Sequence, residues 1–96
     1  MDHRIYKYPI NLGMRQQALF LPKCGRILSV QMQHGECQLW AIVDKEAPRV
    51  GRRFEVLPTG AIVEDHDKLV FLGTVQVDGG SLIFHVFERL STEGPK

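Results

Sequence analysis

The sequence has few cysteines, almost no net charge and no long apolar run. Its 96 residues include two cysteines, one tryptophan and a formal net charge of +1 at pH 7. Two cysteines do not make the disulfide framework of a small secreted domain, so Cys24 and Cys37 are expected to be reduced thiols with a structural or incidental role. A near-neutral chain is not expected to bind long nucleic acids, because domains that do so are usually clearly basic.

Membrane and export signals are missing as well. No segment approaches the roughly 20 apolar residues of a membrane-spanning helix, so we expect no membrane partner. The first residues, MDHRIYKYPI, lack the run of about 7–15 apolar residues that follows the basic region of a signal peptide. We therefore expect a cytoplasmic protein.

What is present is the composition of an ordinary globular domain, 44% hydrophobic and 24% charged. We take residues 1–96 as a single domain, and expect the polar segment 91–96 to be a flexible tail. A chain of this length buries only about 60–65% of its unfolded surface on folding. Because association would bury more, a homo-oligomer is expected.

Short apolar runs, rich in β-branched and aromatic residues, predict an all-β fold. Turn residues such as Gly13, Pro22 and Gly60 separate these runs. The pattern is typical of a small antiparallel sandwich or barrel of about seven short strands. The strands are predicted at residues 4–8, 17–21, 26–34, 37–43, 52–57, 69–77 and 81–88.

Two predicted hairpins have similar sequences. Residues 29–44, SVQMQHGECQLWAIVD, and residues 74–88, TVQVDGGSLIFHVFE, share a hydroxyl-Val-Gln start, a glycine turn and an apolar run closed by an acid. Gly35 and the pair Gly79–Gly80 predict the two tight turns. The repeat has two open explanations: the alternation common to any two hairpins, or a duplication with pseudo-symmetric docking.

Alternation within strands assigns side chains to two faces. Leu28 and Val30 are expected on a core face, as are Phe71 and Val75. A polar wall on the opposite faces would suit a planar, hydrogen-bonding ligand, although ordinary solvent-facing glutamines explain the same pattern. The residues of this predicted wall are Ser29, Gln31, Gln33, Thr74, Gln76 and His85.

Three aromatic residues could add a stacking surface to this wall. Trp40, the single tryptophan, is either a core residue or a platform for a planar ligand. Tyr6 and Tyr8 are two positions apart and hence on one face of a strand. The same two interpretations apply to them.

Positive charge is concentrated in a predicted loop, DKEAPRVGRRF, at residues 44–54. Arg49, Arg52 and Arg53 carry guanidinium groups that match phosphate geometry. A solvated charged hairpin is the alternative interpretation. Shortly after this loop, Thr59 has a hydroxyl and Gly60 a flexible backbone amide. Both groups could contact a phosphate or a ribose.

Signals for catalysis and for metals are weak. His34 and Cys37 are spaced like one of the two ligand pairs of a zinc site, but the sequence has no convincing second pair. The run Asp-His-Asp at 65–67 is typical of a turn, and His85 has no nucleophile spaced to meet it. We therefore expect no metal site, no cofactor and no enzymatic activity.

Several motifs together resemble a family of small proteins found in bacteriophages and prophage-bearing bacteria. They are YKYP near the start, Val-Gln-x-Gln-x-Gly at 30–35, WAIVD at 40–44, the pair Thr59–Gly60 and FHVFE at 84–88. The resemblance runs over residues 5–88. Phage proteins of this size include β-rich sponges that sequester cyclic nucleotide immune signals, often as symmetric oligomers. The resemblance therefore implies an anti-defence role.

The leading hypothesis is a non-catalytic phage immune-evasion protein in the cytoplasm of the infected bacterium. It would bind and sequester a small anionic second messenger of the cyclic oligonucleotide type. Arginines would hold phosphates, aromatic rings would stack on a base and polar side chains would bind base edges. Alternatives are a module that docks on a host defence protein, or a phage structural or assembly accessory protein. The candidate ligand-binding residues are Tyr6, Tyr8, Gln31, Gln33, Trp40, Arg49, Arg52, Arg53, Thr59, Gly60, Gln76 and His85.

Overall fold

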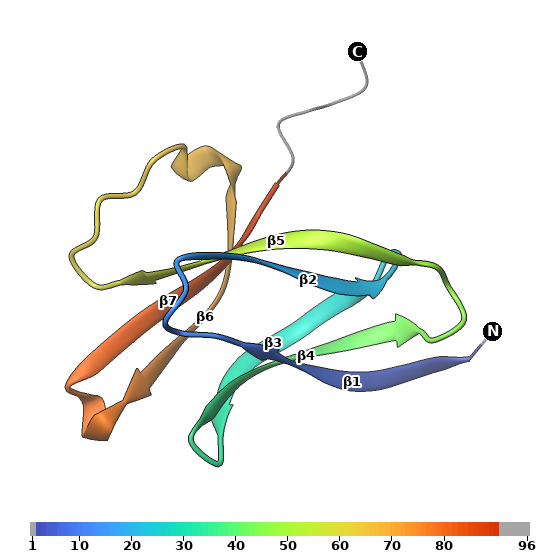
Figure 1. Cartoon of the computed structure of the whole chain (residues 1–96), viewed down its shortest axis with the longest axis horizontal. Helices are drawn as coiled ribbons and strands as arrows, with labels where there is room; N and C mark the ends of the chain where they lie inside the picture. The colour runs from blue at the N-terminus through green and yellow to red at the C-terminus, as the bar shows by residue number, and fades with distance from the viewer. Residues whose placement is uncertain (1, 91–96) are drawn as a thin grey trace.

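The described residues, 2–90, form seven strands arranged in two antiparallel sheets, as a computed structural model shows (Figure 1). The all-β prediction is therefore confirmed. The predicted tail, residues 91–96, lies outside the described part of the chain. Between residues 2 and 90 no helix has the length and apolar character needed to cross a membrane.

Sheet A has three strands and sheet B has four. In sheet A, β1 (His3–Ile10) pairs with β4 (Glu36–Asp44), which pairs with β3 (Arg26–Gln33). The strand order in sheet B is β2 (Gln16–Pro22), β5 (Arg49–Pro58), β7 (Leu82–Arg89) and β6 (Leu69–Val77). Two short 3-10 turns, η1 (His66–Lys68) and η2 (Asp78–Gly80), flank β6.

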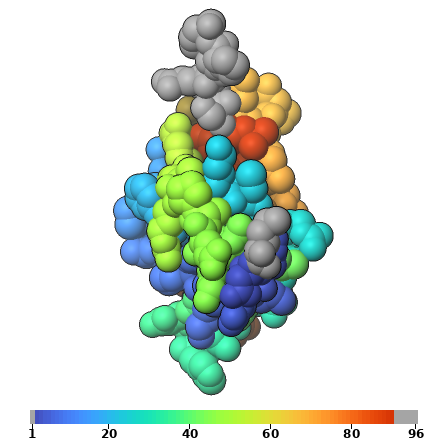
Figure 2. All heavy atoms as spheres, turned by 90° about the vertical axis from the view of Figure 1, so that its right-hand side faces the viewer, coloured from blue at the N-terminus to red at the C-terminus, as the bar shows by residue number. Residues whose placement is uncertain are grey.

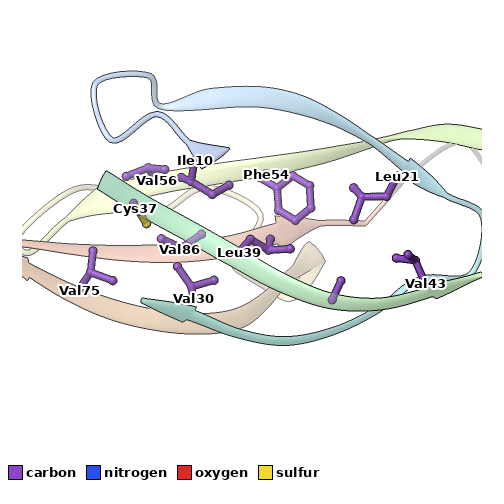
Figure 3. Close-up of a cluster of buried hydrophobic side chains, with 11 residues drawn as sticks. Ile10, Leu21, Val30, Cys37, Leu39, Val43, Phe54, Val56, Val75 and Val86 are labelled. Atoms are coloured by element: carbon purple, nitrogen blue, oxygen red, sulfur yellow. The ribbon is translucent and has the colours of Figure 1, made fainter. Parts of the chain in front are cut away.

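The core lies between the two sheets (Figure 3). On β4 it takes every second side chain, because successive side chains of a strand point to opposite faces. Phe54, on β5, is fully buried, and burying a large apolar side chain stabilises the fold by about 1.5–3 kcal/mol. The buried members of this core are Ile10, Leu21, Val30, Cys37, Leu39, Ala41, Val43, Phe54, Val56, Val75 and Val86.

The predicted turn between β3 and β4 is confirmed. It has two central residues, His34 with a φ of 52° and Gly35 with a φ of 80°. Positive φ at both positions defines the type I′ turn, whose twist matches that of the flanking strands. Glycine adopts this conformation without steric cost, which explains its place in the motif.

Two β-bulges change the faces that simple alternation predicts. In β3 the register shifts between Ile27 and Ser29, so Ile27 faces the core and Leu28 is 44% exposed. In β6 the shift lies between Phe71 and Gly73, and Phe71 is 58% exposed. The expected core placement of Leu28 and Phe71 is therefore wrong. Leu28 is itself the extra residue of the first bulge, and Phe71 precedes the second bulge, across which the alternation reverses.

The two similar hairpins belong to different sheets and point the same way in Figure 1. Val30 of β3 and Val75 of β6 are both buried in the core, as expected. Gln31 and Gln76, by contrast, lie on the outer faces of opposite sheets. The repeat therefore does not build one continuous polar wall.

Candidate functional site

The candidate ligand-binding residues are distributed over both outer faces of the sandwich and its interior. Seen along its edge, the molecule is a thin slab, with principal extents of 42 × 37 × 17 Å (Figure 2). Side chains on opposite outer faces are separated by the two sheets and the core. They cannot bind the same small ligand within one chain.

One group lies on the outer face of sheet A. Trp40 sits on the central strand, and in the register it has Lys7 on one side and Ser29 on the other. Its neighbours on β4, Leu39 and Ala41, point into the core, so the indole points outward. Gln38 and Gln31 form the adjacent pair, and Gln33 follows on β3. We call this surface the Trp40 face; its residues are Lys7, Ser29, Gln31, Gln33, Gln38 and Trp40.

A hydrogen bond spans the Trp40 face. The Lys7 ammonium donates to Gln33 Oε1 at 2.6 Å, from β1 to β3. Because β4 lies between these strands, the two side chains cross it at the level of Gln38, which is only 7% exposed. An ammonium has three donors, so Lys7 keeps hydrogen-bonding capacity beside Trp40. Lys7 and Gln38 were absent from the predicted site, because their proximity depends on strand pairing.

Tyr6 and Tyr8 lie on the other side of β1. They pair with Ala41 and Leu39, whose side chains are fully buried, so the tyrosines face inward at the edge of sheet A. Tyr8 packs against the core, and its hydroxyl is buried without a hydrogen-bond partner among the described residues. Burial raises the pKa of Tyr8. Neither ring can stack on the same base as Trp40.

The three predicted phosphate-binding arginines do not converge. The segment expected to be a loop is strand from Arg49 onward, so Arg52 points to the opposite face from Arg49 and Arg53. Arg52 lies on the inner side, where it forms two 2.7 Å hydrogen bonds with the Glu88 carboxylate and a 2.6 Å bond to the Gly25 carbonyl oxygen. Its guanidinium is thus already occupied.

The other two arginines lie outside the core. Arg49 donates to the Phe20 carbonyl oxygen at 3.2 Å. Arg53 points to the outer face of sheet B, where it is opposite Ala18 and Arg89 in the register. Neither shares a face with Trp40.

His85 and two threonines occupy another part of the outer face of sheet B. Thr59 Oγ1 lies 2.7 Å from His85 Nε2, and Thr74 Oγ1 lies 2.9 Å from His85 Nδ1. Both ring nitrogens are therefore engaged by threonine hydroxyls. Gln76 lies two residues beyond Thr74, and Gly60 follows Thr59 in the turn after β5. The structure thus brings Thr59 and His85 together but separates them from Trp40.

The two residues considered as half of a zinc site, His34 and Cys37, lie in different environments. His34 occupies the hairpin turn, whereas the Cys37 side chain lies in the core. Burial raises the pKa of Cys37 to about 11. Within residues 2–90, no group of three or more His, Cys, Asp and Glu side chains is placed to hold a metal ion.

Comparison with known proteins identifies a family. A family model described as a domain of unknown function (DUF7352) matches residues 1–95. No curated protein and no solved structure matches the chain.

Proposed function

We propose that this chain, which belongs to the DUF7352 family, is a non-catalytic protein that binds a small nucleotide-type ligand on the Trp40 face. The supporting observation is the position of Trp40, central in sheet A with Lys7 and Ser29 directly beside it. An indole, an ammonium and several amides side by side offer the three kinds of contact that a nucleotide needs.

Each contact has a physical basis. A base stacked on the Trp40 ring gains about 1–3 kcal/mol, and stacking needs a flat surface rather than a deep pocket. The amides of Gln31 and Gln33 have both donors and acceptors, so they suit the polar edge of a base. Lys7 provides a charge for a phosphate.

The phosphate contacts in this proposal differ from those expected from the sequence. Arg52 is paired with Glu88, and Arg49 and Arg53 lie away from Trp40. Lys7 replaces them, because it shares a face with the indole. Arg26 supports the same role, since it pairs with Ile42 on this outer face, one pair along from Trp40.

The proposed mechanism is sequestration. Stacking and hydrogen bonding hold the ligand unchanged, and binding lowers the concentration of free ligand. The resemblance to phage and prophage proteins supports a host signalling nucleotide of the cyclic oligonucleotide type as that ligand. A two-fold homo-oligomer would bring two Trp40 faces to such a symmetric molecule.

Calorimetric titration with linear and cyclic nucleotides tests the proposal. We expect at least one to bind with saturation and to be recovered intact after the protein is denatured. Trp40→Ala should weaken binding by roughly 5- to 150-fold, the loss of about 1–3 kcal/mol of stacking. Phe20→Ala is the matched control, because Phe20 is 62% exposed on the outer face of sheet B.

Three outcomes would contradict the proposal. Failure of the whole panel to bind would favour a protein-docking module. Recovery of degraded nucleotide would indicate an enzyme. Equal binding by the wild type and Trp40→Ala would place the ligand elsewhere on the molecule.

A further inference from the structure

The outer face of sheet B contains a carboxylate that is buried although it points away from the core. Phe54 and Val56 point between the sheets, so Glu55 points outward. It is nevertheless only 3% exposed. Burial of a carboxylate is unfavourable unless the group is paired and hydrogen-bonded. The surroundings of Glu55 must therefore compensate its charge.

Two side chains from neighbouring strands provide this compensation. Arg89 of β7 forms an ion pair with Glu55, donating its Nε–H to Oε2. Gln16 of β2 donates its amide to the same oxygen at 3.1 Å. The Arg89 side chain is itself only 12% exposed. Three strands of sheet B thus build one polar cluster.

A second arginine, Arg53, lies beside this cluster and has no ion-pair partner among residues 2–90. Arg53 is directly opposite Arg89 in the β5–β7 register. Like charges in directly opposite positions of adjacent strands are unfavourable. Glu55 balances Arg89, whereas Arg53 forms no ion pair or side-chain hydrogen bond within residues 2–90. An anion between the two guanidinium groups would remove the repulsion.

Two adjoining cavities lie against these residues. One, of about 330 Å³, is lined by Arg53, Glu55, Arg89 and Gln16, among others. The other, of about 270 Å³, has Arg15 in place of Arg53. A water molecule takes about 30 Å³ in the liquid, so each cavity has room for a ligand of several non-hydrogen atoms. We call the surface formed by Arg15, Gln16, Arg53, Glu55 and Arg89 the arginine cleft.

Charge distinguishes the two cavities. The first is lined by two arginines and one carboxylate, Glu55, which leaves one positive charge. The second is lined by two arginines and two carboxylates, since Glu64 also borders it, and is therefore neutral. An anion would thus bind preferentially in the first cavity, beside Arg53.

The second cavity is shaped by the chain between β5 and η1. Arg15 donates to the Ile62 carbonyl oxygen at 2.8 Å, and Arg89 donates to that of Glu64 at 3.3 Å. Both arginines therefore hold this connection against sheet B. Each therefore spends a donor on this connection, whereas Arg53 donates no side-chain hydrogen bond within residues 2–90 and has all five N–H groups for a ligand.

We infer that the arginine cleft is a binding site for a small ligand that carries an oxyanion, a phosphate monoester or a carboxylate. The oxyanion accepts two parallel hydrogen bonds from Arg53, in the geometry that guanidinium groups favour. The paired Glu55 and Arg89 form a preorganised wall beside it. The site lies on the opposite outer face from Trp40 and does not depend on the nucleotide proposal.

NMR titration of the arginine Nε–H signals tests this site. Inorganic phosphate, phenyl phosphate and benzoate are added separately, so that the phosphate and carboxylate sources are distinguished. We expect at least one to shift the Arg53 and Arg89 signals with saturation. Arg53→Ala should weaken that binding about tenfold or more, because a charge-assisted hydrogen bond is lost. Arg53→Lys, which keeps the charge without the fork, should give an intermediate loss.

The matched control is Arg4→Ala, at the start of β1 in sheet A, which should leave the shifts of the Arg53 and Arg89 signals unchanged. Equal shifts of all arginine signals, or equal losses in Arg53→Ala and Arg4→Ala, would show general surface attraction and overturn the inference. Absence of any shift with all three probes would also overturn it. In the Trp40→Ala variant the Arg53 and Arg89 signals should shift as in the wild type, so this test fails or succeeds separately from the nucleotide test.

Discussion

Gly73 of β6 lies against the backbone of Val30 on β3. A Cβ at position 73 would be 3.3 Å from the Val30 carbonyl oxygen and 3.4 Å from its Cβ. The two strands are edge strands of different sheets, so this contact brings the sheets together along one side of the sandwich. The absence of a side chain at residue 73 permits this close approach.

Gly73→Ala is therefore expected to destabilise the protein. The new methyl group must displace backbone atoms, and such overpacking costs about 1–3 kcal/mol, more than the gain from a less flexible unfolded chain. Thermal unfolding should show a Tm lower by about 4–8 °C per kcal/mol. Gly51→Ala is the control, because its methyl group would meet the exposed Phe20 ring, which can rotate away. Equal Tm values for Gly73→Ala and wild type would contradict this packing.

Arg52→Met should destabilise the fold without affecting ligand binding. The Arg52 and Glu88 side chains are 21% and 15% exposed, so removal of the arginine leaves a carboxylate mostly buried and unpaired. Loss of one partner of a fully buried pair costs about 3–5 kcal/mol, and partial exposure should reduce this to about 1–3 kcal/mol. Denaturant unfolding measures the loss.

The double variant Arg52→Met with Glu88→Gln is the matched control for this pair. It removes both charges and should recover part of the lost free energy of unfolding. Nucleotide titration of the single variant adds a second readout. A large loss of nucleotide affinity at unchanged stability would restore Arg52 as a phosphate-binding residue.

The two cysteines should differ sharply in their reactivity. Cys24 is exposed, whereas Cys37 is 2% exposed. The thiolate is the reactive form, and a pKa of about 11 leaves little of it at Cys37 near pH 8. Iodoacetamide at pH 8 should therefore modify Cys24 alone, as mass spectrometry of peptides can show. In a denaturant both should react, and equal rates in the native protein would contradict the burial of Cys37.

Cys37 should also make the stability fall at alkaline pH. Its pKa rises from 9.0 to about 11 on folding, because burial disfavours the thiolate. Below pH 9 the thiol is protonated in both states, and between pH 9 and 11 the unfolded chain loses the proton first. The free energy of unfolding should therefore fall as pH rises through this window, by up to about 2–3 kcal/mol.

Denaturant unfolding at several pH values measures this effect. Cys37→Ala removes the titrating group and should show a smaller decrease between pH 9 and 11, although its stability at pH 7 is lower. Parallel pH profiles for the variant and the wild type would contradict the assignment to Cys37. Tyr8, whose pKa burial also raises, titrates in both proteins and does not affect the comparison.

The strands and turns could be predicted from sequence because their signals are local. Apolar alternation and a glycine such as Gly35 depend only on neighbouring residues. The faces of Leu28 and Phe71 could not be predicted in this way. Leu28 lies in a bulge and Phe71 directly precedes one. A bulge depends on pairing with a partner strand and leaves no fixed mark in the sequence.

The candidate sites were only partly predictable for the same reason. Alternation separates Arg52 from Arg53, but only the packed sheets decide that Arg52 faces inward toward Glu88. Glu55 was a detectable signal, since it is a charge within the apolar run FEVLP. Its partner Arg89, 34 residues away, follows from the pairing of β5 with β7.

The sequence by itself determined that the chain is all-β, where its strands lie apart from the start of β5, and that Val30 and Val75 are core residues, because these properties follow from local alternation. Only the tertiary structure decided which polar residues meet. Pairing with β1 places Lys7 beside Trp40, and the division into two sheets separates Gln31 from Gln76. Such contacts depend on the register between distant segments, which the spacing of residues along one strand does not encode.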